Sequence, residues 1–213
     1  MKIRFCLLLT IVVLCATSCV NNRVITRHIQ GSPFFMCYRK DSHFGLFSEK
    51  NRKLTNCCFI QTQSMECNYF AEEKVLLVQD KRGKQHLIDE NLCSIAVGDS
   101  FSRISKNIWY VQNAKYHYLL NSQSNMLVEV DDATFVFNQY FIVKTAQGIS
   151  LLDKQLREIF PSNPCIYVQL ETEKFFTRNP KTLGYDMFQN GKFQESISPE
   201  KFGKLSNLLT ICK

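Results

Sequence analysis

The sequence predicts an all-β fold built from about five tandem β-meander repeats, and three observations lead to this prediction. A pattern of apolar strand, polar turn and second apolar strand recurs along the chain. The apolar runs are rich in β-branched and aromatic residues, which favour strands. The segments between them carry the glycine and asparagine residues that tight hairpin turns need.

The repeat becomes visible when one residue in each second strand is taken as an anchor. The anchors are spaced 41, 32, 32 and 34 residues apart: Leu46, Leu87, Leu119, Leu151 and Tyr185. Eight residues after the anchors stand Leu54, Ile95, Leu127, Ile159 and Phe193, and eight or nine residues before them stand Tyr38, Val78, Val111, Val143 and Phe176. One such meander cannot bury its apolar face alone, so we expect neighbouring units to stack.

The best-defined strands and turns alternate in the middle and the second half of the chain. Strand-like runs occur at 108–111, 135–137, 140–143 and 174–177. Turns between paired strands are expected at 80–83, 112–115, 145–148 and 178–181. Each unit is therefore interpreted as a hairpin with one or two further short strands.

The units resemble the WG-type β-repeat of bacterial proteins, which runs as a strand, a GLID-like segment, a turn and an apolar residue before proline. The best match is Gly148–Asp153 followed by Glu158–Pro161, and 86–89 and 44–47 match less closely. The Trp-Gly pair that names the family is absent. The resemblance spans most of residues 36–197 and implies a non-enzymatic β-repeat module, commonly in exported or surface proteins.

The arrangement of the units is predicted to be a small β-propeller, because closure removes exposed sheet edges. An open β-solenoid of hairpins is the alternative. The chain end differs from the repeats: Ser198 and Pro199 are typical of a helix start. A helix over 198–213 would place Phe202, Leu205, Leu209 and Cys212 on one face and cap the last repeat. A closing strand is the alternative for this segment.

The first eighteen residues are typical of a signal peptide. A basic start precedes an uncharged apolar run at 5–15, which is shorter than the about twenty residues that span a bilayer. Ala-Thr-Ser before Cys19 resembles the lipobox of bacterial lipoproteins, which implies lipidation of Cys19. A secreted protein that begins at an unmodified Cys19 is the alternative. No acidic export tag follows, so we expect the protein in the bacterial cell envelope, on the outer membrane and facing the periplasm.

The predicted organisation is therefore a signal peptide at 1–18, a lipid-anchored linker at 19–33, a β-repeat domain at 34–197 and a capping helix at 198–213. Seven cysteines lie beyond Cys19, and an odd number predicts at least one free thiol or one intermolecular disulfide: Cys37, Cys57, Cys58, Cys67, Cys93, Cys165 and Cys212. Their pairing is left open. The sequence has no CxxC spacing of the kind found in structural zinc sites, so it does not indicate zinc binding. We expect no metal or other cofactor.

Candidate site residues fall into three groups. His43, His86 and His117 stand near corresponding strand starts and would bind a metal only if the units brought them together, whereas exposed strand ends are the simpler interpretation. The acids and amides after the second strands, Asp89, Asn121 and Asp153, are interpreted as turn-forming residues. A candidate binding surface for glycan or peptide consists of four aromatic residues: Trp109, Tyr110, Tyr116 and Tyr118.

The net charge of +7 is mild and does not indicate nucleic-acid binding. The sequence contains no recognisable catalytic motif. We therefore predict a non-enzymatic, membrane-tethered lipoprotein that binds or scaffolds a protein or glycan in the envelope. The alternatives are a hydrolase of envelope polymers, with carboxylates from separate repeats, and a structural outer-membrane subunit. Two carboxylates in one pocket would favour the hydrolase, and a surface of aromatic and turn residues would favour binding.

Overall fold

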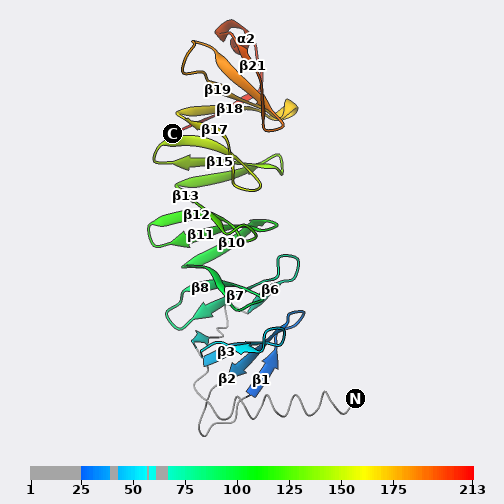
Figure 1. Cartoon of the computed structure of the whole chain (residues 1–213). Coiled ribbons are helices and arrows are strands. Elements are labelled where there is room, and N and C mark those ends of the chain that lie inside the picture. The colour runs from blue at the N-terminus through cyan, green and yellow to red at the C-terminus, as the bar shows by residue number, and fades with distance from the viewer. Residues whose placement is uncertain (1–24, 39–42, 57, 61–66) are drawn as a thin grey trace. The chain divides into compact units, whose positions relative to one another are not determined.

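The computed structural model describes residues 25–38, 43–56, 58–60 and 67–213, which form antiparallel β-sheets, one short α-helix and one 3-10 turn (Figure 1). The predicted signal peptide and Cys19 lie outside the described residues. The chain divides into two compact units, residues 1–101 and 102–213. Within the described ranges, no helix has the length and apolar character needed to cross a membrane.

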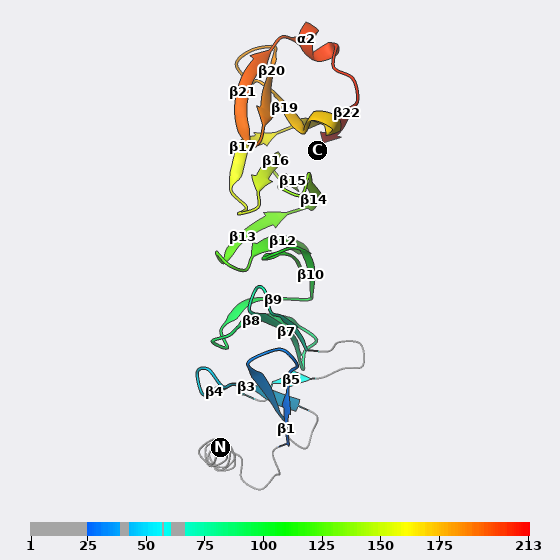
Figure 2. The same ribbon diagram turned by 90° about the vertical axis from the view of Figure 1, so that its right-hand side faces the viewer.

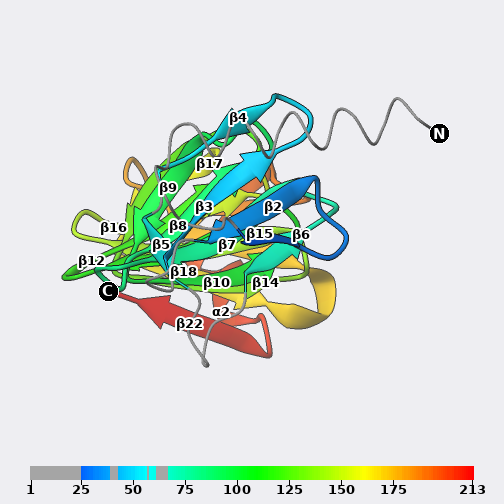
Figure 3. The ribbon, with the colours of Figure 1, turned by 90° about the horizontal axis from the view of Figure 1, so that it is seen from below.

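The N-terminal unit contains two meanders in one nine-stranded sheet, with the main strand order β1-β2-β3-β5-β7-β8-β9. Its strands are β1 (Ile25–His28), β2 (Phe34–Tyr38), β3 (His43–Ser48), β4 (Lys53–Leu54), β5 (Phe59–Ile60), β6 (Asn68–Phe70), β7 (Val75–Asp80), β8 (Gln85–Asp89) and β9 (Ser94–Gly98). Figure 3 shows β2 beside β3, to which it pairs antiparallel. The predicted linker 19–33 is wrong in its second half, because β1 pairs with β2 from Ile25 onward.

The core of the N-terminal unit joins its two meanders. Phe34 and Leu46 of the first meander and Leu76 of the second are fully buried in one apolar cluster. Burying a large apolar side chain contributes about 1.5–3 kcal/mol. The two meanders therefore stabilise each other, as expected for units that cannot bury their faces alone.

The C-terminal unit contains three successive sheets, and the first strand of the first sheet begins two residues before the unit does. The first consists of β10 (Ser100–Ser105), β11 (Ile108–Asn113), β12 (Tyr116–Asn121) and β13 (Met126–Val130), and the second of β14 (Asp132–Val136), β15 (Tyr140–Thr145), β16 (Gly148–Asp153) and β17 (Glu158–Asn163). The third consists of β18 (Cys165–Gln169), β19 (Lys174–Arg178), β20 (Tyr185–Gln189), β21 (Lys192–Ile197) and β22 (Leu208–Cys212), with a 3-10 turn at Leu170–Thr172.

Two apolar clusters hold these three sheets together. Ile108 and Leu119 of the first sheet pack with Phe141 of the second in one cluster. Ile142 of the second sheet and Phe175 of the third share the other cluster. The central sheet is therefore buried on both faces, which explains the continuous apolar runs of β15 and β16.

The predicted repeat is confirmed at the level of strands. The predicted second strands are β3, β8, β12, β16 and β20, and each is paired on one side with the strand that precedes it in the repeat: β2, β7, β11, β15 or β19. The apolar positions that follow the anchors lie in β4, β9, β13, β17 and β21. The fold is all-β, with five meanders and a short C-terminal helix. The choice between a closed propeller and an open solenoid stays a prediction.

The C-terminal segment is a short helix followed by a strand, so the predicted helix over 198–213 is wrong beyond its first turn. Helix α2 covers Pro199–Gly203, and the Ser198 side chain accepts a hydrogen bond from the Lys201 amide as predicted. Figure 2 shows α2 followed by strand β22. Strand β22 pairs with β18, and a disulfide joins Cys212 to Cys165. The five-residue pairing with β18 and this cross-link hold the segment as a closing strand, in place of continued helix.

The predicted capping role is retained by a single residue of α2. The ring of Phe202 stacks on Tyr185, with ring centroids 3.7 Å apart, and its centroid lies 5.0 Å from that of Tyr167. These tyrosines belong to β20 and β18. The helix therefore covers the face of the last sheet that points away from the shared core of the second and third sheets.

Candidate functional site

The four predicted surface aromatics do not form one surface. Trp109 is only 1% exposed, and pairing of β11 with β12 places it on the same sheet face as Tyr118 and Tyr116. Tyr110 points to the opposite face, where its ring meets that of His117 at a centroid distance of 5.5 Å. Only Tyr116 is strongly exposed, at 55%. The four residues therefore do not lie together on one exposed face, because Trp109 is buried and alternation along β11 directs Tyr110 to the other side of the sheet.

The three histidines do not lie in one cluster within either unit. His86 Nε2 lies 3.1 Å from Asp80 Oδ2, and the edge of the His86 ring meets Phe59. His43 also belongs to the N-terminal unit, and His117 belongs to the C-terminal unit. No group of three or more histidine, cysteine or acidic residues suited to a metal ion occurs among the residues that the structure describes.

The residues after the second strands are turn-forming, as predicted. Asp153 Oδ1 accepts hydrogen bonds from the amides of Gln155 at 2.8 Å and Arg157 at 2.9 Å. Asp89 Oδ1 accepts from the amides two and four residues ahead, and Asn121 Oδ1 from those two and three residues ahead. The side-chain oxygens of these residues satisfy turn amides, so the two carboxylates among them, Asp89 and Asp153, do not form a catalytic pair within the described turns.

Replacing Asp153 with alanine is expected to lower the free energy of unfolding by about 1–3 kcal/mol, because two turn amides lose a charged acceptor. Asp153→Asn should cost less, since asparagine fills the corresponding turn position at Asn121. Urea denaturation of both variants checks this. Equal losses in the two variants would contradict the turn-forming role.

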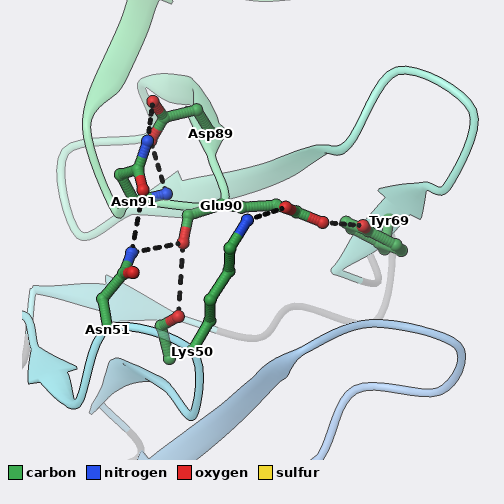
Figure 4. Close-up of polar contacts among 7 residues, drawn as sticks. Lys50, Asn51, Tyr69, Asp89, Glu90 and Asn91 are labelled. Carbon is green, nitrogen blue, oxygen red and sulfur yellow. Dashed lines mark hydrogen bonds and ion pairs between the residues drawn. The ribbon is translucent and has the colours of Figure 1, made fainter.

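A polar network centred on Glu90 links the two meanders of the N-terminal unit (Figure 4). The Glu90 carboxylate accepts a hydrogen bond from Tyr69 Oη at 3.0 Å and forms an ion pair with Lys50 Nζ at 3.0 Å. The Glu90 carbonyl accepts from Asn51 Nδ2 at 3.1 Å, and Asn51 also donates to Asn91 Oδ1 at 2.9 Å. The network joins the Lys50–Asn51 turn to the Glu90–Asn91 turn and to Tyr69 of β6, so we interpret it as structural.

The electrostatics of this network are set by burial and by its hydrogen bonds. Burial, together with the hydrogen bond and charge of Glu90, raises the pKa of Tyr69 to about 12. Burial alone would raise the pKa of Glu90, but hydrogen bonds from Lys50 and Tyr69, with the charges of Lys50 and Lys74, outweigh it and lower that pKa. Near neutral pH the network therefore combines a charged Glu90 with a protonated Tyr69.

The stability of the protein is expected to fall as the pH rises from about 10 to about 12, because the unfolded Tyr69 loses its proton before the folded one does. Tyr69 contributes its full stabilisation at pH values below its unfolded pKa, and this stabilisation is lost as the pH rises through its folded pKa. Tyr69→Phe should flatten this part of the stability curve, and Tyr116→Phe, at an exposed position, should leave it unchanged. Denaturant titrations across this pH window measure the effect; an unchanged slope in Tyr69→Phe would contradict it.

The C-terminal unit contains an open cavity of about 530 Å³ between the turns of its second and third sheets. Its apolar floor consists of Tyr140 at the start of β15, Ile159 in β17 and the Gly191 backbone. Gly191 has a φ of +69°, and an added Cβ there would lie 3.5 Å from both the Tyr140 ring and the Ile159 side chain. A Cβ would make ordinary van der Waals contact at this distance, so glycine is favoured here by its positive φ in the β20–β21 turn.

The rim of the cavity is polar and carries more positive than negative charges. Three amide side chains and three cationic side chains line it: Gln139, Gln155, Asn190, Lys154, Arg157 and Lys192. Asp153 is the one carboxylate among the described lining residues, and it accepts from Arg157 Nε at 2.8 Å in addition to its turn amides. Burial, followed by the charges of Glu173 and Asp153, raises the pKa of Tyr140, so its phenol stays protonated near neutral pH.

Sequence reasoning missed this cavity because its residues come from turns of two successive repeats. The Asp153 turn and the Asn190–Gly191 turn are each recognisable in the sequence, but their proximity depends on how the second and third sheets pack. Hydrogen-bonding amides and cations over a small apolar floor are suited to bind a polar ligand. A single carboxylate that is already bound by a turn and an arginine is not suited to paired acid–base catalysis.

No protein-family model matches the sequence, and no curated protein matches it. Among solved structures, the C-terminal WD40 domain of Sif2 is similar with a TM-score of 0.29 and 11% identity, over 78% of this chain and 57% of that one. Dihydro-heme d1 dehydrogenase NirN gives a TM-score of 0.28 and 15% identity, over 84% and 48% of the two chains. BamB from Moraxella catarrhalis is similar with a TM-score of 0.26 and 8% identity, over 84% of this chain and 76% of that one.

The chain spans about half of the length of the first two of these structures. The all-β assignment of this chain therefore rests on its own strands and sheet pairing.

Proposed function

We propose that the protein is a non-enzymatic, membrane-tethered lipoprotein whose β-repeats bind a glycan in the bacterial cell envelope. The observation that carries the binding function is the cavity of the C-terminal unit. Turn residues, amides and cations line it, and its one described carboxylate, Asp153, is held by turn amides and by Arg157. A retaining or inverting glycoside hydrolase generally needs two carboxyl groups across the scissile bond, so the lining favours binding over hydrolysis.

The tether is supported by the sequence before Val20 and by one feature of the fold. Residues 1–18 have the order of charge and apolarity of a signal peptide, and Cys19 follows small residues as in a lipobox. The Cys165–Cys212 disulfide is typical of proteins that fold in an oxidising compartment. Both features fit a protein that is exported and anchored through Cys19, on the periplasmic side of the outer membrane.

The tether is tested by the intact mass of the protein purified from bacterial membranes. We expect a chain that begins at Cys19 and carries acyl mass, and Cys19→Ser should remove the acyl mass and release the protein from the membrane fraction. A chain without acyl mass, recovered in the soluble fraction, would contradict the anchor.

The binding function is tested by incubating the same protein with envelope polysaccharide. We expect saturable retention of the polysaccharide and no release of new reducing ends over time. Steady production of reducing ends that tracks the protein concentration would instead identify the hydrolase alternative.

A further inference from the structure

We infer that the cavity between the turns of the second and third sheets of the C-terminal unit selects an anionic saccharide, one that carries a carboxylate or phosphate group. This inference rests on the proposed glycan-binding function and names the chemical class of its ligand. It follows from the balance of charge on the cavity rim and from the arrangement of amides around the floor.

The charge balance on the rim is positive. Lys154, Arg157 and Lys192 contribute three positive charges, and Asp153 contributes one negative charge that is bound to Arg157 by contacts of 2.7 and 2.8 Å. Lys154 and Lys192 form no ion pair with any residue that the structure describes. Two lysines without an ion pair among the described residues therefore line one cavity, and a ligand with a negative charge would be attracted to it.

Two acidic residues limit where such a charge can lie. The charges of Glu173 and Asp153 both act on Tyr140 at the floor. An anionic group is therefore disfavoured beside the Tyr140 phenol and favoured near the two lysines that line the cavity, Lys154 and Lys192. The bound anion would remain partly hydrated there, where a flexible ammonium group serves well as a point charge.

The remaining lining groups fit the hydroxyls of a sugar. The side chains of Gln139, Gln155 and Asn190 each carry two N–H donors and one carbonyl acceptor, and the Gln155 carbonyl also accepts a hydrogen bond from Arg157. A sugar hydroxyl both donates and accepts, so it matches an amide in either orientation. The volume of about 530 Å³ lies within the range of about 300–1,000 Å³ that is usual for small-ligand sites, so the cavity is suited to one end or one short stretch of a glycan chain.

The test is isothermal titration calorimetry of the full-length protein in detergent micelles with four probes: a galacturonic acid trimer, a hexose phosphate, maltotriose and inorganic phosphate. We expect the trimer, the hexose phosphate or both to bind, and to bind more tightly than maltotriose and inorganic phosphate. Which of the two anionic sugars binds identifies the carboxylate or the phosphate as the recognised group. Higher salt should weaken the binding.

A matched pair of double variants locates the binding. Lys154→Ala/Lys192→Ala should weaken binding of the anionic sugar about ten-fold, equivalent to about 1.4 kcal/mol. Lys181→Ala/Lys204→Ala removes the same charge from exposed positions of the same unit outside the cavity, and it should bind as the wild type does. Equal losses in both double variants would assign the effect to net charge and overturn the inference.

Three other outcomes would also overturn the inference, and they differ in whether the proposed glycan binding still stands. Equal binding of maltotriose would remove the selectivity for anions but keep glycan binding. Equal binding of inorganic phosphate would show a general anion site with no contribution from the sugar. Failure of both anionic sugars to bind would overturn the inference alone if envelope polysaccharide is still retained, and the proposed binding function as well if it is not.

Discussion

Phe175→Ala is expected to lower the free energy of unfolding by about 3–5 kcal/mol, the largest loss expected for any substitution considered in this fold. The Phe175 side chain is fully buried between the second and third sheets of the C-terminal unit. Its ring meets the ring of Tyr140 edge-on at a centroid distance of 5.3 Å and that of Phe137 at 5.4 Å. The substitution removes these contacts and leaves a cavity that the two packed sheets cannot fill by local relaxation.

Phe193→Ala is the matched control, because it makes the same change in the same sheet at a side chain that is 55% exposed. We expect this variant to lose less than about 1 kcal/mol. Guanidinium denaturation followed by circular dichroism measures both variants. Similar losses at Phe175 and Phe193 would mean that the second and third sheets do not share a packed core.

The repeat could be predicted from the sequence because it depends on local properties. Alternating apolar and polar residues, and turns rich in glycine and asparagine, determine where a strand starts and ends. The turn-forming role of Asp153 could be predicted for the same reason, since its partners lie two and four residues ahead. The Ser198 cap also acts within one turn.

Features that depend on packing between repeats could not be predicted in this way. Strand β1 is a short segment with no repeat partner in the sequence, and its place is given by pairing with β2. The exposure of Trp109 depends on which face of β11 is covered, and periodicity gives the alternation but not the covered face. The cavity likewise needs two turns from separate repeats to meet.

The cysteine pairing belongs to the same class, because Cys165 and Cys212 lie 47 residues apart in the sequence. They become direct neighbours only when β22 returns to pair with β18. Their Cα atoms then lie 4.2 Å apart, close enough for a cross-strand disulfide. An odd number of cysteines in the sequence gives no indication of which pair will meet in this way.

Loss of this disulfide is expected to be the second large effect. Replacing Cys212 with serine should lower the free energy of unfolding by about 2–4 kcal/mol, because the cross-link closes a long loop and restricts the unfolded chain. The same substitution should loosen β22 and the preceding α2, since β22 is an edge strand that pairs only with β18 among the described strands. Denaturation of Cys212→Ser and Cys165→Ser, with and without reducing agent, measures the loss.

The loss of stability should come from the Cys165–Cys212 disulfide alone. Reduction should destabilise the wild type by as much as either serine substitution does, and it should have no further effect on the variants. Cys93→Ser, at an exposed thiol in the N-terminal unit, is the control and should keep the stability of the wild type. In the reduced protein, the β18 and β22 amides should lose protection against hydrogen exchange before the β15 and β16 amides do. Strands β15 and β16 keep their protection longer because the core covers both faces of their sheet. If all these strands lost protection together, the disulfide would be stabilising the whole unit and not its closing strand.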